Sequence, residues 1–254
     1  MPGAALWPCS SVPDGFDVTA FLGEFTELAR KKGFTRRLLS ETAAGPLLAW
    51  ERLEEGTPGY ISAGMHGDEP AGPLAALELL RSGALDEGSW LICPALNPTG
   101  LAAGTRENAE GLDLNRDYLS RSSSEVRTHA AWMEGLPCPR IFVSLHEDWE
   151  STGFYFYEIN LGEDRPDRAA SILKAVEPWF PAEPATVIDE HDIRSAGWIY
   201  HVPEADVPKH WPEAIFLAKR GCPVSLTFET PSANCLNLRT AAHVAAVTAA
   251  LAFG

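Results

Sequence analysis

Apolar residues in segment 18–29 recur three and four positions apart, which predicts a helix with one buried face. The same spacing predicts further helices at 70–81, 122–133, 167–176, 214–220 and 235–251, and short apolar runs predict strands at 47–53, 60–63, 90–96, 141–145, 154–159 and 224–228. Strands and helices therefore alternate along most of the chain. This alternation favours an α/β fold with a mixed, mostly parallel sheet flanked by helices. Because no repeat or linker divides the chain, we expect a single domain over residues 1–254.

The charge balance restricts the partners of this chain. Its 254 residues carry 35 acidic and 20 basic side chains, for a formal net charge of -15. A chain this acidic is a poor ligand for the phosphates of a nucleic acid and for an anionic membrane surface. We therefore expect a small-molecule or peptide partner, and the sequence leaves the oligomeric state open.

The cysteines argue against a disulfide framework, an iron–sulfur centre or a cysteine zinc site. There are five, an odd number, and no two have CxxC spacing; they are Cys9, Cys93, Cys138, Cys222 and Cys235. Cys93 and Cys222 lie in apolar runs and are expected to be buried thiols. No signal peptide is recognisable, and the longest apolar stretch, 241–253, is too short to cross a membrane, so we expect a soluble cytoplasmic protein.

Four side chains suited to metal chemistry follow predicted strands. His66 and Glu69 come after strand 60–63, His146 after strand 141–145, and Glu229 after strand 224–228. Ligands of α/β folds bind beyond the carboxyl ends of the strands. Two imidazoles and a carboxylate form a typical catalytic zinc shell, and a second carboxylate can serve as general base.

The His-x-x-Glu spacing has little specificity when it is taken alone. It occurs three times, at His66/Glu69, at 201/204 and at 210/213. Only the first occurrence follows a strand, opens a helix and contains glycine. We interpret the other two as surface pairs.

The long segment 97–118, rich in Gly, Asn and Asp, is predicted to be a functional loop. It contains Arg106 and Arg116, whose planar guanidinium groups suit a substrate carboxylate or a developing oxyanion. Asn115 adds an amide beside them. Alternatively, the two arginines only neutralise the acidic residues of the same loop.

Six elements in this order, in matching strand context, resemble the zinc metallocarboxypeptidase family. They are His66-x-x-Glu69, Asn97-Pro98-x-Gly100, Arg106, Asp113-Leu114-Asn115-Arg116, His146 and Thr227-Phe228-Glu229. The resemblance spans about residues 58–232 and implies a three-layer α/β/α fold. The His-Gly-Asp-Glu form is most similar to the short bacterial branch that includes murein peptide amidases, and the family is related to succinylglutamate desuccinylase and aspartoacylase.

The resemblance implies a role for each of the four strand-end residues. His66, Glu69 and His146 are expected to bind one zinc ion per chain. Glu229 is expected to activate the metal-bound water as general base and to pass its proton to the leaving amine.

The resemblance also implies a substrate-binding set. Arg106 is expected to stabilise the tetrahedral oxyanion, and Asn115 and Arg116 to hold the terminal carboxylate of the substrate. Typical members use a mobile tyrosine ahead of the catalytic glutamate, and Tyr200 is the candidate here.

The chain departs from typical members in two places. Gly67-Asp68 stands where they carry an arginine, and Glu147-Asp148-Trp149 stands where they carry Ser-x-Tyr. Both changes add acid near the site, which favours a substrate that carries an amino group, such as diaminopimelate or lysine. Alternatively, Glu147 and Asp148 point away from the site or support a histidine ligand.

The remaining polar and aromatic candidates are interpreted as structural. The run 154–157 is typical of a strand with one core face, and His129 and His243 are expected on helices in structural or exposed positions. His191, among acidic neighbours, is interpreted as part of a solvated acidic loop rather than as an ion site.

The leading hypothesis is a zinc-dependent hydrolase that cleaves a peptide or amide bond next to a free carboxylate. The first alternative is an N-acyl amino acid deacylase of the aspartoacylase type. It ranks lower because those relatives typically carry an additional β-rich C-terminal domain, whereas only 25 residues follow Glu229 here. The second alternative is an inactive binding protein on the same scaffold. A serine hydrolase and nucleotide chemistry are disfavoured because the corresponding glycine motifs are absent.

Overall fold

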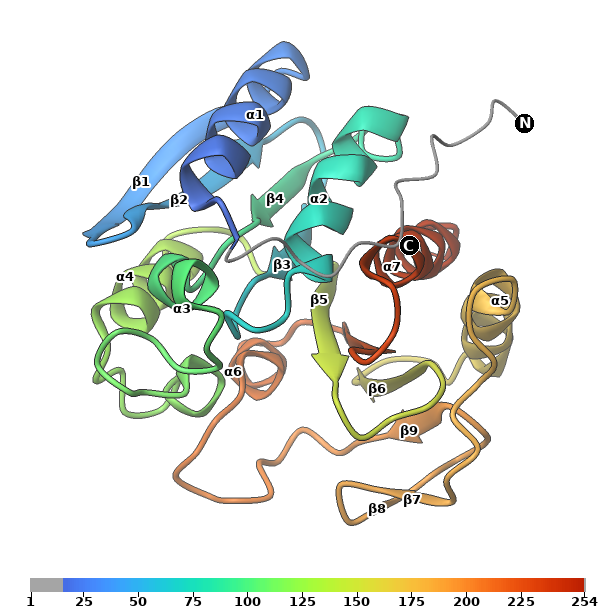
Figure 1. Ribbon diagram of the computed structural model, residues 1–254. Coiled ribbons are helices and arrows are strands. Elements are labelled where there is room, and N and C mark those ends of the chain that lie inside the picture. Colours follow the sequence, from blue (N-terminus) through green and yellow to red (C-terminus); the bar gives the residue numbers. More distant parts are fainter. Residues whose placement is uncertain (1–15, 254) are drawn as a thin grey trace.

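The computed structural model describes residues 16–253 as a sheet between two layers of helices (Figure 1). The eight strands of the main sheet have the spatial order β1-β2-β4-β3-β5-β10-β6-β9. They are β1 (Thr35–Thr42), β2 (Gly45–Arg52), β3 (Gly59–Ala63), β4 (Trp90–Cys93), β5 (Ile141–Asp148), β6 (Tyr155–Asn160), β9 (Trp198–Tyr200) and β10 (Val224–Pro231). A separate small ribbon pairs β7 (Val187–Ile188) with β8 (His191–Asp192).

The sheet is mixed and mostly parallel, as the alternating pattern predicts. The central strands β4, β3, β5 and β10 are parallel, and β9 lies parallel to β6. Strand β2 runs antiparallel to both β1 and β4, and β6 runs antiparallel to β10. Because the parallel strands end at the same edge, the residues that follow them meet there.

Helices cover both faces of the sheet (Figure 1). On one face, α1 (Val18–Lys31), α2 (Ala71–Ser82), α5 (Pro166–Val176) and α7 (Leu236–Leu251) enclose the larger core, and on the other, α4 (Ser124–Glu134) and α6 (Glu213–Lys219) enclose a second core. Successive strand residues serve opposite cores: Ile61 and Val143 pack in the first, Tyr60 and Phe142 in the second. Burial on both faces explains why the central strands are continuous apolar runs.

Several features differ from the sequence-based expectations, including the short strands β7, β8 and β9, which were not predicted. Strand β1 was not predicted, because this edge strand is polar and largely exposed. The segment 97–118 is not all loop, since it contains helix α3 (Pro98–Ala103) and the short 3-10 helix η1 (Leu114–Arg116). Strands β5 and β10 continue through His146 and Glu229, so these residues lie on strand ends rather than after them.

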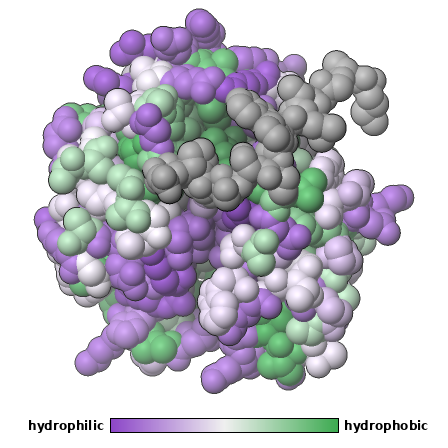
Figure 2. All heavy atoms as spheres, viewed as in Figure 1, coloured by the Kyte–Doolittle hydropathy of each residue, from purple (hydrophilic) through white to green (hydrophobic). Residues whose placement is uncertain are grey.

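The molecular surface is largely hydrophilic on the face shown in Figure 2. The apolar patches on this face are small and separate. Over residues 16–253, no helix has the length and hydropathy needed to cross a bilayer. Cys93 and Cys222 are buried free thiols as expected, whereas Cys9 lies outside the described residues.

Candidate active site

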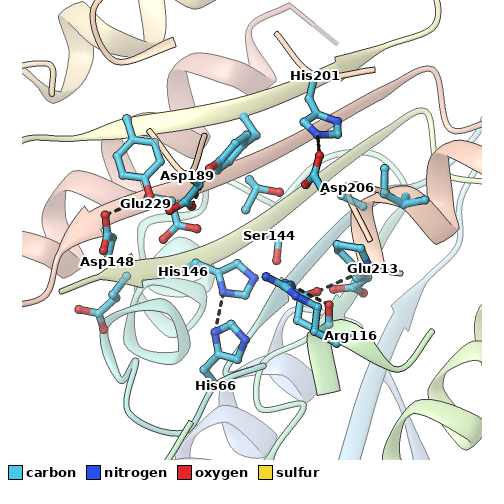
Figure 3. Close-up of a pocket in the computed structure, with 18 of the residues that line it drawn as sticks. His66, Arg116, Ser144, His146, Asp148, Asp189, His201, Asp206, Glu213 and Glu229 are labelled. Carbon is cyan, nitrogen blue, oxygen red and sulfur yellow. Dashed lines mark hydrogen bonds and ion pairs between the residues drawn. The ribbon is translucent and has the colours of Figure 1, made fainter. Parts of the chain in front are cut away.

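A cleft of about 430 Å³ opens at the carboxyl edge of the central strands. This volume lies in the range of small-molecule and peptide sites. In Figure 3, His66 and His146 lie together in the cleft, Glu229 lies on one side with Asp148 and Asp189, and Arg116 and Glu213 lie on the other. The structure therefore brings together the strand-end residues and the arginines of segment 97–118.

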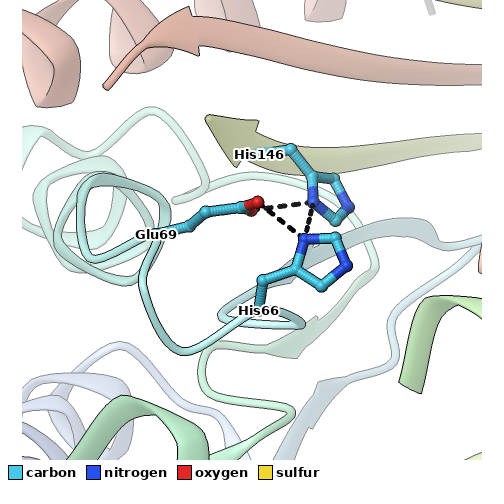
Figure 4. Close-up of side chains that lie close together, drawn as sticks. All are labelled: His66, Glu69 and His146. Atoms are coloured by element: carbon cyan, nitrogen blue, oxygen red, sulfur yellow. Dashed lines mark hydrogen bonds and ion pairs between the residues drawn. The ribbon is translucent and has the colours of Figure 1, made fainter. Parts of the chain in front are cut away.

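His66, Glu69 and His146 point their donor atoms at one another (Figure 4). Glu69 Oε1 lies 2.6 Å from His66 Nδ1, and Glu69 Oε2 lies 2.9 Å from His146 Nδ1. The two Nδ1 atoms are 3.3 Å apart. All three side chains are buried, and they come from the β3–α2 loop and from β5. Two imidazole nitrogens and a carboxylate that converge in this way fit the donor set of a catalytic zinc site.

The charges at this cluster are those that a cation would require. Burial alone would raise the pKa of Glu69, but the two histidines outweigh burial and lower it to about 2. Burial would lower the pKa of His66, but the charge of Glu69 and the contact with Asp113 raise it to about 9. An ionised carboxylate thus faces the two imidazoles, and an ionised carboxylate is the form that binds a divalent ion.

Asp113 links the cluster to the substrate side of the cleft. Its Oδ1 lies 3.3 Å from His66 Nε2 and accepts a hydrogen bond of 2.9 Å from the Asn115 backbone N–H at the start of η1. Its Oδ2 accepts from Arg106 Nε at 3.1 Å and Nη2 at 3.0 Å. A carboxylate against the outer nitrogen of a histidine ligand orients the ring, and Asp113 holds Arg106 in place at the same time.

A close backbone contact fixes the loop that carries His66 and Glu69. A Cβ atom on Gly67 would lie 1.8 Å from the carbonyl carbon of Gly100 in α3. The Gly67 N–H also donates to the Thr105 carbonyl oxygen at 2.9 Å. Asn97 caps α3 by accepting from the Gly100 N–H at 2.8 Å and donates to the Arg106 carbonyl oxygen at 3.3 Å. The glycines and Asn97 therefore serve the packing that aligns the two loops.

Replacing Gly67 with alanine should displace this loop. We expect the free energy of unfolding to fall by about 1–3 kcal/mol, the usual cost of overpacking, and metal retention to weaken because His66 moves. Thermal unfolding and elemental analysis measure the two effects. Gly23→Ala in α1 is the control, since nothing lies within 4 Å of its Cβ position. Equal stability and metal content in both variants would contradict this account of the loop.

Glu229 lies beside the metal cluster but is not part of it. It is the register partner of His146 on the neighbouring parallel strand. Burial raises its pKa well above the ordinary value, and the charges of Glu69 and Asp148 raise it further. A raised pKa makes the ionised form of Glu229 a stronger base than an ordinary carboxylate, which suits a general base.

The predicted substrate-binding residues occupy the other side of the cleft. Asn115 and Arg116 form the end of η1, and both line the cleft. The Asn115 side-chain oxygen accepts a hydrogen bond from the Glu213 backbone N–H at 3.0 Å. This orientation leaves the amide nitrogen of Asn115 able to donate to another acceptor. Arg116 is exposed and donates to the Asn115 carbonyl oxygen at 3.0 Å. Arg106 is 40% exposed, so a substrate can reach it.

Glu213 is a buried carboxyl in the cleft wall that the sequence analysis interpreted as half of a surface pair. That interpretation was wrong, because its side chain is 1% exposed. Glu213 accepts from Tyr60 Oη at 2.8 Å and from Ser62 Oγ at 2.7 Å. His129, whose pKa burial lowers to about 3, continues the network to Tyr118 at 2.9 Å. His210 is exposed as expected, and only the tertiary structure brings these polar groups together.

Glu213 should make stability depend on pH. Burial raises its folded-state pKa to about 7 from an ordinary 4.5. The folded protein therefore retains this proton after the unfolded chain has lost it, so Glu213 lowers stability progressively as pH rises from 4.5 to 7. The full effect is about 3 kcal/mol. Glu213→Gln should remove this decline in urea unfolding at several pH values, whereas Glu204→Gln, with a side chain 68% exposed, should keep it. A retained decline in Glu213→Gln would refute the assignment.

Tyr200, the candidate substrate tyrosine, does not line the cleft. It lies on β9 with Trp198 on the face that packs against the larger core, and Arg194 stacks on its ring. Strand alternation explains this placement, since Ile199 between them faces the opposite side. The tyrosines that do line the cleft are Tyr155 and Tyr157.

The aromatic run 154–157 has one core face, as expected, and its other face lines the cleft. Phe154 and Phe156 pack in the core as predicted, whereas Tyr155 and Tyr157 alternate with them and face the cleft. The Tyr155 hydroxyl donates to Asp148 at 3.1 Å and the Tyr157 hydroxyl to Asp189 at 2.8 Å. The alternation of Phe and Tyr along the run is the period-two pattern that indicates a strand with two different faces.

Glu147 and Asp148 behave differently from each other. Glu147 is buried, forms an ion pair with Arg239 and accepts from the Ala71 N–H at the start of α2 at 2.7 Å. Its carboxylate is therefore committed to the scaffold. Asp148 accepts from the Tyr155 hydroxyl with Oδ2 and from the Glu150 backbone N–H with Oδ1, and it lines the cleft, where its negative charge can attract a substrate cation.

The histidines outside the cluster divide into two groups. His129 and His243 are fully buried on α4 and α7, as structural residues. His191 and His201 were assigned to a solvated loop and a surface pair, but both line the cleft and their rings lie 4.7 Å apart. The ribbon β7–β8 and the chain after β9 fold back over the sheet edge, which no local pattern indicates.

Sequence comparison with known proteins identifies one family profile and a set of related amidases. The sequence profile of the succinylglutamate desuccinylase/aspartoacylase catalytic domain matches residues 55–251. A murein peptide amidase A of Vibrio campbellii is 33% identical over 93 residues, which cover 36% of this chain and 38% of that protein, so the match spans well under two thirds of the relative.

Solved structures share the fold over nearly the whole chain. A protein of Shewanella denitrificans, provisionally described as a metallopeptidase, has a TM-score of 0.82 at 22% identity and covers 96% of this chain and 98% of its own. A metallo-carboxypeptidase of Burkholderia cenocepacia has a TM-score of 0.65 at 20% identity, with 91% of this chain and 66% of its own covered. At these identities the likeness establishes the fold.

Proposed function

We propose that this chain, which belongs to the succinylglutamate desuccinylase/aspartoacylase catalytic-domain family and is an enzyme, is a zinc-dependent hydrolase of small peptides. The bond cleaved is a peptide or amide bond next to a free carboxylate. The observation that carries the proposal is the convergence of His66, Glu69 and His146 in one cleft with Glu229 beside them.

His66, Glu69 and His146 would hold the ion through two Nδ1 atoms and the carboxylate. Zinc bound by such a set supplies Lewis acidity and lowers the pKa of water towards about 7. Asp113 orients the His66 ring through its outer nitrogen. Three protein ligands leave a position open towards the cleft.

Glu229 would move the proton. Its carboxylate accepts the proton of the attacking water and then delivers it to the nitrogen of the leaving amine. The raised pKa favours the first transfer, since the base must hold the proton between the two steps. Arg106, oriented by Asp113, points Nη1 towards the cluster, 3.3 Å from His66 Nδ1, where it can stabilise a developing oxyanion.

Asn115 and Arg116 would position the substrate carboxylate. They and Arg106 place three donors on one side of a cleft whose other charged side chains are mostly acidic. Asp148 and Asp189 on the opposite side favour a substrate that also carries an amino group. A peptide with both groups, of the kind that murein peptides contain, fits this polarity.

The carboxylate requirement is the test of this proposal. Zinc-loaded enzyme should hydrolyse a peptide with a free carboxylate at least ten times faster, in kcat/KM, than the same peptide as its amide. Arg116→Ala should lower kcat/KM for the peptide with the free carboxylate by about 10- to 100-fold, which corresponds to the loss of one hydrogen bond to a charged group. The kcat/KM for the slowly hydrolysed amide form of the peptide should not change. Arg127→Ala, an exposed arginine on α4, is the matched control. Equal rates for acid and amide would overturn the proposal.

A deacylase is the second candidate, because the family profile that matches this chain is named for two deacylases. The same residues would then hold an N-acyl amino acid by its carboxylate. An N-acetyl or N-succinyl amino acid in the same assay distinguishes the two: faster turnover than the peptide would favour deacylation. If no substrate is hydrolysed and no zinc binds, the scaffold is a binding protein.

A further inference from the structure

A second group of donor atoms lies in the cleft away from the first. His191, His201 and Asp206 each offer one atom, and these atoms lie within 4.8 Å of one another. His191 Nε2 is 3.4 Å from Asp206 Oδ2, and His201 Nε2 is 3.2 Å from Asp206 Oδ1. In Figure 3, the His201–Asp206 pair lies apart from the His66–His146 pair.

The hydrogen bonds fix the donor atom of His201. Its Nδ1 contacts the Val202 carbonyl oxygen, which can only accept, so Nδ1 carries a proton. In the neutral ring, Nε2 then carries a lone pair that faces a carboxylate oxygen of Asp206 at 3.2 Å. These two atoms can share a proton or bind a metal ion together. A backbone carbonyl on the far nitrogen is also the usual support of a metal-binding histidine.

The two rings lie close to each other and to one carboxylate. The His191 and His201 ring centroids are 4.7 Å apart, and the Tyr157 ring packs edge-on against both. The Asp206 side chain is 65% exposed, so an ion from solvent can reach it. One divalent ion could bind both rings in their neutral form together with this carboxylate.

We propose that His191, His201 and Asp206 form a second divalent-metal site, selective for ions such as zinc that prefer nitrogen ligands. An ammonium group is a poorer occupant, because neutral imidazoles give it only two weak acceptors. The three ligands come from β8, from the residue after β9 and from the following loop. The ion would therefore fasten three segments of one cleft wall, and three protein ligands leave a position open for water or a substrate group.

Metal binding tests the site directly and does not depend on activity. Protein purified without added metal should first be stripped with a chelator and then titrated with Co²⁺, followed by its visible spectrum and by elemental analysis after dialysis. The unsubstituted protein should bind two ions per chain. His201→Ala and Asp206→Asn should each bind one, and His146→Ala should retain the ion at the second site alone.

His210→Ala is the matched control, because His210 is an exposed histidine of the same segment outside the group. It should bind two ions. A single ion in the unsubstituted protein that His146→Ala removes would overturn the second site, as would a second ion that His201→Ala retains. Circular dichroism of each variant separates ligand loss from unfolding. If the first site alone fails to bind, the proposed hydrolase activity fails while the second site stands.

Discussion

Replacing Glu229 with glutamine should lower kcat/KM by about 10²- to 10⁴-fold, the usual contribution of a general base, and leave the zinc content unchanged. The amide has nearly the shape of the carboxylate but cannot accept the proton of the attacking water. Because Glu229 lies on β10 beside His146 and is not one of the three converging ligands, the metal should stay.

Elemental analysis and steady-state kinetics on the same preparation measure both parts of this prediction. Both proteins, purified without added metal, should hold about one zinc per chain at the buried site. Glu150→Gln, a carboxylate at the cleft rim, is the control and should keep most of the activity. A Glu229→Gln variant with the full rate would remove Glu229 from the chemistry.

Replacing His146 with alanine should remove the buried ion and the hydrolytic activity together. His146 supplies one of three donors, and its loss also leaves Glu69 with a single imidazole partner. Two remaining ligands hold zinc weakly, so the variant should emerge from purification without an ion at the buried site. Hydrolysis should fall to the background rate, because neither Glu229 nor Arg106 can replace the Lewis acid.

His129→Gln is the appropriate control for this loss. His129 is equally buried, on α4, and contacts Tyr60 and Tyr118 rather than the cluster. It should keep one zinc even where its stability is reduced. Zinc retained at full occupancy in His146→Ala would show that the ion is held elsewhere.

Local patterns predicted the central part of the fold well. The buried strands β3 and β5 are short apolar runs, and α1 and α7 follow helical spacing, so their packing faces can be read from the chain. Strand β1 is polar and exposed, and β7, β8 and β9 are only two or three residues long, so no local pattern identifies them. Their pairing depends on neighbours that are distant in sequence.

The candidate site shows the same division. The sequence by itself determined the donors at the ends of the central strands, because parallel strands must end at one edge and bring His66, His146 and Glu229 together. Tertiary structure decided the rest. Glu213 is buried in the cleft wall, Tyr200 faces away from it, and His201 meets Asp206 there. These outcomes depend on how a loop or strand packs against distant segments, and local periodicity carries no information about such contacts.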